Sequence, residues 1–525
     1  MSDNNLVSRN AVQLRRMIGA KEISPVELLD ACIDRIEAIN PAVNAVTATC
    51  YDAAREAAKA AERKVLAGAP LGLLHGLPLG VKDLEDTANL LTTYGSPMSR
   101  AHVPSRDVVL VERLRAAGAI LVGKTNVPEL GAGANTRNPV WGATGNPFNP
   151  ELNAGGSSGG SAAALACDML PVCTGSDTGG SLRIPASKCG VVGFRPSAGL
   201  VPNSRRLLGW TPISVVGPMG RDVEETALQL AATAGLCSGD PLSYEVDASR
   251  FTRLPEFDLA TLRVAYTEDF GACDVNDDIR AVFRSRMAAL GKMVHTCEPV
   301  HFDLGDAHRA FDVIRAESFV AGLRDAYTRD PDDAESFVAG LRDAYTRDPD
   351  ALGPNTRANY EMGASMTLAD SAWAQAEQTR IFKRFQWAFE QYDVVVSPTT
   401  PVSPFPWREL YAAQINGRAQ ENYYRWLALT YVVTLTTHPA ISLPCGVDHA
   451  DMPFGLQVVG PFHGDLKTLS VARAMERAFD NDPALRRPRP DLSKLTQPNP
   501  ALKSIVTAPP VLDANSAMES GMSSV

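Results

Sequence analysis

The stretch TGSDTGGSLRIP, residues 174–185, has the composition of a loop that brings backbone close to a bound group. Gly179 and Gly180 carry no Cβ, so the chain can approach a ligand closely at this point. Ser181 follows them directly, which places a hydroxyl beside backbone N–H groups able to stabilise an oxyanion. A serine nucleophile needs a base, yet the nearest histidine upstream, His102, lies in no motif typical of a histidine triad. The base must come from elsewhere in the chain.

Around this loop, short apolar runs alternate with helical segments. LPLGV precedes Lys82, AILVG follows Gly118, and AISLP lies near residue 440. Apolar runs of this length are typical of buried strands. The alternation predicts an α/β fold in which a central mixed or parallel sheet is covered by helices.

The length of 525 residues allows one large domain or several. We expect one domain over residues 1–484 and a mostly disordered tail over 485–525, where proline is frequent and periodicity is weak. Within the domain we expect a helical cover (1–68), a core (about 70–240), a variable helical region (about 240–390) and a final sheet and helix segment (391–484).

One internal repeat stands out in the variable region. AESFVAGLRDAYTRDPD occupies residues 316–332 and recurs unchanged at 334–350. Pro331 and Pro349 should each end a helix, so we expect two short helices joined by a turn. Two copies do not make a solenoid, and we interpret the repeat as a duplication in a tolerant surface region.

Composition excludes several classes of function. The net charge of −10 argues against binding nucleic acid or an anionic membrane by bulk electrostatics. The polar N-terminus shows no secretory signal, and no apolar run reaches the roughly 18 residues of a membrane helix. The nine cysteines form no CxxC pair, and the histidines show no paired-ligand spacing. We therefore expect a cytoplasmic protein with no metal and no cofactor.

The segment GAILVGKT, residues 118–125, matches the pattern of a phosphate-binding loop. That loop needs a flexible turn between its glycines, so that backbone amides point at phosphate. Here the intervening residues are Ala, Ile, Leu and Val, which favour a strand. We therefore interpret Lys124 as structural.

A second glycine-rich stretch, GGSSGGSAAALA at 155–166, precedes an alanine-rich helix. Alone it would indicate an anion cradle at a helix N-terminus or a tight turn. It occurs together with the Ser181 loop and with LHGLPLGVKDLEDT, which places Lys82 at the end of a strand.

These stretches together resemble the amidase signature family of amide hydrolases. Further matching segments, in the order of that family, are TTYGSP, GAILVGKTNVPELG, GNPFNP, GSDTGGSLRIPASKCGVVGFRPS, THPAISLPCG and PFGLQVVGP. The resemblance covers roughly residues 8–480 and is dense from 70 to 220. It implies a single large α/β domain with helices on both faces of a mixed sheet.

The resemblance also implies a Ser–Ser–Lys triad. Ser181 would be the nucleophile, Ser157 a bridge for its proton and Lys82 the base, with a cis peptide near the bridging serine. The backbone amides of Thr178, Gly179, Gly180 and Ser181 would form the oxyanion hole, and Asp177, Arg183 and Ser158 would support the site.

Physical chemistry sets conditions on this relay. Lys82 can accept a proton only when neutral, and burial favours the neutral amine. Asp83 would oppose this, so we expect its carboxylate to point elsewhere. Asp177 and Arg183 are interpreted as a structural ion pair, and His75 as a turn or core residue.

Two further groups of residues are less decisive. Tyr94, Trp141, Phe148 and Trp210 are candidates for the substrate pocket, although each type is more often core. Lys188 stands at a usually apolar position of the family pattern, and Ala154 replaces a usual proline. Both departures concern packing near the site.

The predicted activity is that of an amidase acting on small to medium amides, with aryl amides, esters and carbamates also open to it. The expected partner is this small molecule, without nucleic acid or membrane, and a homodimer is left open. One alternative is the glutamine-hydrolysing subunit of a tRNA-dependent amidotransferase, although residues 359–385 lack that subunit's arginine-rich recognition segment. The other is a non-catalytic or nucleotide-binding protein.

Overall fold

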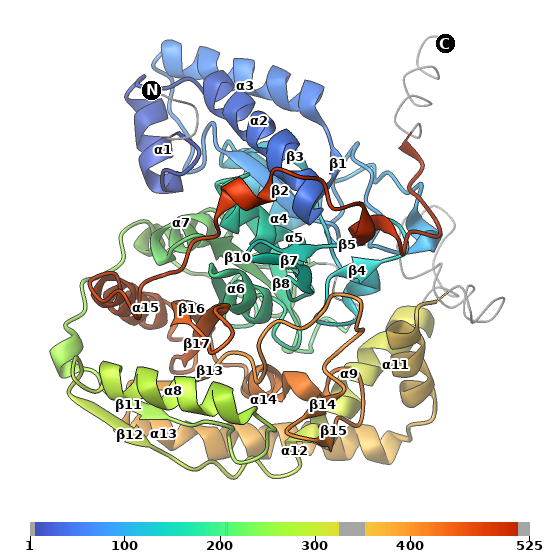
Figure 1. Ribbon diagram of the computed structural model, residues 1–525, viewed down its shortest axis with the longest axis vertical. Coiled ribbons are helices and arrows are strands. Elements are labelled where there is room, and N and C mark those ends of the chain that lie inside the picture. Colours follow the sequence, from blue (N-terminus) through green and yellow to red (C-terminus); the bar gives the residue numbers. More distant parts are fainter. Residues whose placement is uncertain (1–5, 205, 207, 325–351, 513–525) are drawn as a thin grey trace.

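A central sheet of eleven strands organises the computed structural model, which describes residues 6–204, 206, 208–324 and 352–512 (Figure 1). In spatial order its strands are β1 (Val46–Thr49), β3 (Ile120–Thr125), β2 (Pro78–Lys82), β8 (Val172–Asp177), β10 (Val215–Gly220), β9 (Val192–Arg195), β16 (Ala440–Val447), β17 (Pro453–Val459), β13 (Val394–Pro398), β11 (Arg263–Tyr266) and β12 (Thr296–Pro299). The sheet is mixed, because β2 runs parallel to both β3 and β8 whereas β8 and β10 are antiparallel. The predicted fold class is confirmed.

Helices cover both faces of this sheet. They are α1 (Ala11–Gly19), α2 (Pro25–Val43), α3 (Tyr51–Leu66), α4 (Val109–Ala116), α5 (Gly159–Ala166), α6 (Arg183–Cys189), α7 (Val223–Thr233), α8 (Asp277–Leu290), α9 (Ala307–Arg324), α11 (Pro354–Ala364), α12 (Leu368–Gln386), α13 (Ala388–Gln391), α14 (Ala428–Thr436) and α15 (Asp465–Phe479). The pairs β4 (Arg137–Asn138) with β5 (Gly142–Ala143), β6 (Gly145–Asn146) with β7 (Asn149–Asn153), and β14 (Gln414–Ile415) with β15 (Arg418–Ala419) are small separate sheets.

Alternation along the strands divides the apolar core into two layers. In β3, Ile120 and Val122 belong to a core shared with α2, α3, α5 and α6, whereas Leu121 belongs to a core shared with α1, α4, α7 and α15. Successive side chains of a strand point to opposite faces, so these helix groups lie on opposite sides of the sheet. Sheet and helices thus form one domain.

Local sequence explains the first helices. Ser24 caps α2 and Glu27 closes the capping box, as predicted. The apolar side of α3 consists of alanines and a valine, which allows close packing. The helical cover expected over 1–68 also contributes a strand, β1, and the variable region contributes β11 and β12.

The repeat is described only in part. Its first copy begins inside α9, which continues without a break to Arg324. The rest of that copy and all of the second lie outside the described residues.

The expectation of a disordered tail was wrong for residues 485–512. This segment packs on the N-terminal half of the fold through two short 3₁₀ helices, η10 (Leu492–Leu495) and η11 (Pro500–Lys503). Leu502 is buried with Ala143 and Trp407. Gly142 permits this contact, because a Cβ there would clash with the Leu502 carbonyl oxygen. We call residues 485–512 the C-terminal strap; residues 513–525 lie outside the described part.

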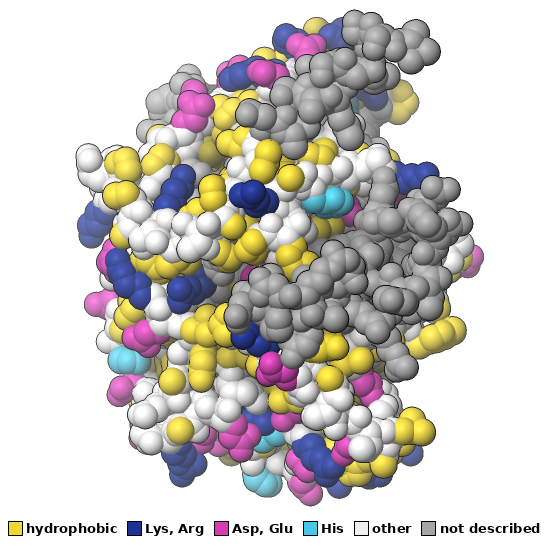
Figure 2. Space-filling view, turned by 90° about the vertical axis from the view of Figure 1, so that its right-hand side faces the viewer, with side chains coloured by type: hydrophobic (Ala, Val, Ile, Leu, Met, Phe, Trp, Pro, Cys, Tyr) yellow, Lys and Arg dark blue, Asp and Glu magenta, His cyan; other side chains and the backbone are white. Residues whose placement is uncertain are grey.

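Two properties of the surface bear on partners. On the face shown in Figure 2, basic and acidic side chains of the described residues are interspersed. No helix in the described ranges combines the length and the apolar character needed to cross a bilayer.

The strap should contribute measurably to stability. Leu502→Ala removes a fully buried side chain and is expected to cost about 2–5 kcal/mol, because the cavity can collapse only in part. Leu512→Ala, which changes a side chain that is 65% exposed, is the control and should cost less than about 0.5 kcal/mol. Denaturant unfolding of the two variants measures the difference, and equal midpoints would show that the strap does not stabilise the fold.

Candidate active site

Three chain segments meet at one edge of the sheet. Lys82 ends β2, Asp177 ends the parallel neighbour β8, and Ser157 lies just before α5. Parallel strands end at the same edge, so the residues that follow them are brought together. The pairing of β2 with β8 is reinforced by the Lys82 amide, which donates to Thr174 Oγ1 at 2.9 Å.

The Lys82 amine is buried and held by two hydroxyls. Nζ lies 2.8 Å from Ser157 Oγ and 2.9 Å from Ser176 Oγ. The peptide bond between Gly156 and Ser157 is cis, as the family resemblance implied. Ser176 was not among the predicted site residues. Alternation along β8 could have indicated it, since Thr174 already faces β2 and Ser176 points to the same side.

The surroundings of Lys82 favour the neutral amine. Burial lowers its pKa to about 7, against the smaller opposing effects of Glu85 and Asp177. The Asp83 carboxylate points away, as expected, and accepts hydrogen bonds from the Thr93 amide and hydroxyl. Burial raises the pKa of Asp83 to about 6, against the influence of Lys124. The adjacent carboxylate is therefore not an ion-pair partner of the amine.

Ser181 lies in the loop between β8 and α6, beside the segment that contains Ser157 and Ser158. Its carbonyl oxygen accepts a hydrogen bond from the Ser158 amide at 3.3 Å. Within the described residues no hydrogen bond joins the Ser181 hydroxyl to Ser157 or Lys82. Catalytic hydrogen bonds often close only when substrate is bound, so this geometry is compatible with a relay whose first link forms in the complex.

The backbone before Ser181 is shaped by glycine. Gly180 has a φ of +121°, and a Cβ there would clash with Thr430 Oγ1. Its amide donates to Asp177 Oδ1 at 2.9 Å. The amides of Thr178, Gly179 and Ser181 have no acceptor in the described part of the chain. Of the four predicted oxyanion donors, Gly180 is therefore already engaged.

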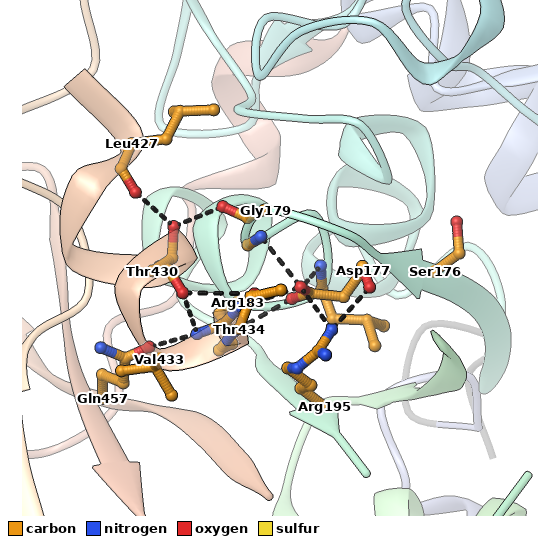
Figure 3. A network of polar contacts seen from close by, with 12 residues as sticks. Ser176, Asp177, Gly179, Arg183, Arg195, Leu427, Thr430, Val433, Thr434 and Gln457 are labelled. Atoms are coloured by element: carbon orange, nitrogen blue, oxygen red, sulfur yellow. Dashed lines mark hydrogen bonds and ion pairs between the residues drawn. The ribbon is translucent and has the colours of Figure 1, made fainter. Parts of the chain in front are cut away.

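A buried ion-pair network fixes this loop (Figure 3). Arg183 donates to both carboxylate oxygens of Asp177, at 3.0 and 2.9 Å, and Arg195 donates to the same group at 3.2 Å. Burial alone would raise the pKa of Asp177, but the two guanidinium groups hold it well below its usual range. The geometry agrees with a structural role for Asp177 and Arg183.

The same arginine ties the loop to distant segments. Arg183 also donates to the Thr430 carbonyl oxygen at 2.9 Å and to Gln457 Oε1 at 2.5 Å (Figure 3). Thr430 Oγ1 in turn donates to the Gly179 carbonyl oxygen at 2.6 Å. Elements β17 and α14 thus set the position of a loop about 250 residues earlier in the chain.

Other predicted residues serve elsewhere. The Ser158 hydroxyl bonds the backbone of Ser176, at 3.4 and 3.5 Å, which supports the end of β8. His75 is buried with Nε2 3.0 Å from the Ala61 carbonyl oxygen, so its core role is confirmed. Lys124 lies in strand β3 and donates to Thr87 Oγ1, which rules out a phosphate loop there.

The four residues predicted as candidates for the substrate pocket lie in different environments. Trp210 is 77% exposed and lies on the surface. Trp141 donates to Thr93 Oγ1 at 2.9 Å, and the Tyr94 hydroxyl donates to Asp86. Phe148 is half-buried and reaches within 3.5 Å of a Cβ built at Gly190, on the α6 side.

Two aromatic residues that the sequence did not indicate lie against residues 178–181. We call this segment the oxyanion loop, because its amides are the predicted oxyanion donors. A Cβ on Gly179 would be 3.2 Å from the Phe311 ring and 3.8 Å from Tyr431. The two rings stack, with centroids 4.3 Å apart. Phe311 belongs to α9 in the variable region, where no motif marks it.

A buried amine beside two serines and a loop with open amides is the arrangement that acyl transfer to a hydroxyl needs. Residues 27–469 match the family model described as Amidase, and the chain belongs to the amidase signature family. It is a hydrolase of carbon–nitrogen bonds.

Relatives and solved structures agree on the family. The chain is 33% identical over 493 residues to the A subunit of the glutamyl-tRNA(Gln) amidotransferase of Acaryochloris marina (strain MBIC 11017), covering 89% of this chain and 97% of that protein. A bacterial aryl acylamidase of the amidase signature family superposes with a TM-score of 0.80 at 28% identity, covering 90% and 96%. The corresponding glutamyl-tRNA(Gln) amidotransferase protein of Thermotoga maritima has a TM-score of 0.64 at 23% identity, covering 93% and 98%.

The pKa of Lys82 leads to a pH prediction. Only the neutral amine accepts a proton, so kcat/KM for amide hydrolysis should rise with pH through about 7 and then level off. Lys188 is also buried, and burial lowers its pKa to about 7 as well. Lys188→Met is therefore the matched control: its pH–rate profile should keep the inflection. Loss of the inflection in Lys188→Met would show that the titrating group is Lys188 and not Lys82.

Proposed function

We propose that the chain is a serine amidase that hydrolyses small to medium amides through an acyl-enzyme intermediate on Ser181. The observation that supports this most is the buried Lys82 amine, which lies 2.8 Å from Ser157 Oγ and whose pKa burial lowers to about 7 against the smaller effects of Glu85 and Asp177. Aryl amides, esters and carbamates present the same carbonyl and are further substrates of the proposed site. The reaction needs neither metal nor cofactor, and the proposed location is the cytoplasm.

The proposed first step is formation of the acyl-enzyme. Ser181 Oγ attacks the carbonyl carbon, its proton passes to Ser157 Oγ, and the proton of Ser157 passes to Lys82 Nζ. The amides of Gly179 and Ser181, with that of Thr178, stabilise the oxyanion; each such donor contributes about 2.7–4 kcal/mol. The C–N bond then breaks as the relay returns a proton to the leaving nitrogen.

Deacylation repeats the relay with water. Water gives its proton through Ser157 to Lys82 as its oxygen attacks the acyl carbon, and the bond to Ser181 Oγ breaks with return of that proton. Ser176, the second acceptor of the Lys82 ammonium, keeps Nζ aimed at Ser157 in both halves of the reaction.

Ser181→Ala should abolish turnover and leave the fold intact. Loss of a nucleophile in a triad costs about 10⁶-fold in kcat. A fluorophosphonate probe should label the wild type and Ser187→Ala, a control on the following helix, but not Ser181→Ala. Residual turnover of Ser181→Ala near the wild-type rate would remove Ser181 from the proposed role.

A second candidate function is glutamine hydrolysis as the subunit of a tRNA-dependent amidotransferase. Its support is the 33% identity, over 89% of this chain, to a protein of that kind, and this similarity favours the alternative over the first candidate. The higher TM-score of the aryl acylamidase points the other way. The middle region, residues 359–385, lacks the arginine-rich recognition segment expected of such a subunit. Its first residue, Asn359, hydrogen-bonds Arg315 and Tyr423.

The two candidates differ in substrate and in partners. A free-standing amidase should release 4-nitroaniline from 4-nitroacetanilide as an isolated chain and show no ammonia release from glutamine. An amidotransferase subunit should release ammonia from glutamine, faster with the companion subunits of a bacterial glutamyl-tRNA(Gln) amidotransferase, and should co-purify with them. The second pattern would replace the first candidate; Ser181 dependence is required in either case.

A further inference from the structure

We propose that Arg315 binds a carboxylate on the substrate, so that this enzyme prefers amides whose acyl part carries a negative charge. This inference rests on the proposed amide hydrolysis and specifies its substrate class. The probes for that class are monoamides of simple short dicarboxylic acids, which carry no amino group. The charge of Arg315, its partners and its position relative to the site all support this role.

Arg315 is a buried cation that has no acidic partner among the described residues. Its side chain is on α9 and the residue is only 8% exposed. Nε donates to Asn359 Oδ1 at 3.1 Å and Nη2 donates to Tyr423 Oη at 2.6 Å, both neutral groups. No carboxylate lies within ion-pair distance of it in the described residues, and Nη1 has no acceptor there. An arginine stays charged in any protein, so this charge requires compensation.

The neighbouring charges do not supply that compensation. Asp312, one turn earlier on α9, is engaged by Arg425 Nη2 at 2.9 Å and by the Tyr424 hydroxyl at 2.8 Å. Glu421, which also contacts Arg425, has a side chain that is 76% exposed. The buried part of this cluster thus contains two guanidinium groups and one carboxylate. An anionic ligand would balance it.

Aromatic rings connect Arg315 to the oxyanion loop. Its guanidinium lies 5.2 Å from the centroid of Tyr424, whose ring contacts Phe311 with centroids 5.8 Å apart. Phe311, one turn before Arg315 on α9, is the ring that lies against Gly179. A turn of helix rises about 5.4 Å, which is the scale of a short aliphatic chain. A substrate carbonyl in the oxyanion loop can therefore extend an acyl chain along Phe311 toward the guanidinium.

Hydrogen bonds connect Arg315 to the other wall of the site. Asn359, its acceptor, donates to the Asn355 carbonyl oxygen at 2.6 Å, and Asn355 Nδ2 donates to the Ala132 carbonyl oxygen at 2.8 Å. The neighbouring Gly131 lies beside the bridging serine, because a Cβ there would be 3.6 Å from Ser157 Oγ. Arg315 therefore bridges the segments on both sides of the reacting groups.

The wild-type enzyme tests the inference without any variant. The probes are the mono-4-nitroanilides of succinic, glutaric and adipic acid and, as a neutral analogue of the glutaric compound, 5-methylhexanoyl-4-nitroanilide. A hydrogen-bonded charge contributes about 10- to 150-fold to binding, and kcat/KM should favour the best dicarboxylic probe over the neutral one by that factor. Equal or inverted preference across all three chain lengths overturns the inference.

Variants then assign the preference to Arg315. Arg315→Met should lower kcat/KM for the anionic probe about 10- to 150-fold more than for the neutral probe. Arg315→Lys keeps the charge and should recover part of the preference. Arg309→Met, which removes an exposed arginine of the same helix, is the matched control and should leave it unchanged. A parallel loss on both probes would show that Arg315 only holds the two walls together.

The outcome separates this inference from the proposed function. Hydrolysis of the neutral probe that depends on Ser181, without preference for a carboxylate, contradicts the role of Arg315 and retains the amidase. Competitive inhibition of the wild type by glutarate, lost in Arg315→Met, is the binding readout that supports the role independently of turnover.

Discussion

The site depends on a buried lysine amine that forms no contact ion pair with any described residue. Lys82 lies at the end of strand β2, where its amine contacts two hydroxyls. Desolvation lowers its pKa to about 7. A carboxylate in contact would restore the ammonium and remove the base. Glu85 and Asp177 are near enough to raise the pKa of Lys82, but burial lowers it by more. Asp83, the adjacent residue, is turned toward Thr93 and toward the second buried lysine, Lys124.

The opposite arrangement stabilises the neighbouring loop. Asp177 is as buried as Lys82 but is surrounded by donors, with Arg183, Arg195 and two backbone amides on its oxygens. Such a carboxylate is fully charged and holds its partners in place, whereas an unpaired one would be costly to bury. The two strands that end at this edge thus place the amine that is the proposed base and a fixed ion pair side by side. In the proposed mechanism the amine moves the proton and the ion pair holds the loop in position.

Sequence patterns predicted those parts of the molecule that are encoded locally. Apolar runs identified β2, β3 and β16, and the capping box located the start of α2. The two glycine–serine loops, together with the family resemblance, indicated the residues that meet at Lys82. Contacts that depend on strand register or on packing between distant segments were not predicted. Ser176 reaches Lys82 only through the pairing of β8 with β2, and Phe311 comes from a region with no motif. The packing of the strap was not predicted, because Leu495 and Leu502 are isolated buried residues in a proline-rich segment that has no helical or strand periodicity.

The strap has a consequence for how the chain is made. Residues 485–512 are synthesised after every strand of the sheet, yet they pack on Pro41 and Pro139 and close the small core around Ala143. The amide of Asn499 bonds the carbonyl of Pro41, a contact that spans most of the polypeptide. Loop closure over such a separation is slow, and domains complete their folding only when all their segments are available. The sheet can therefore assemble before the strap has been made, and this outer closure forms only when the strap has followed it.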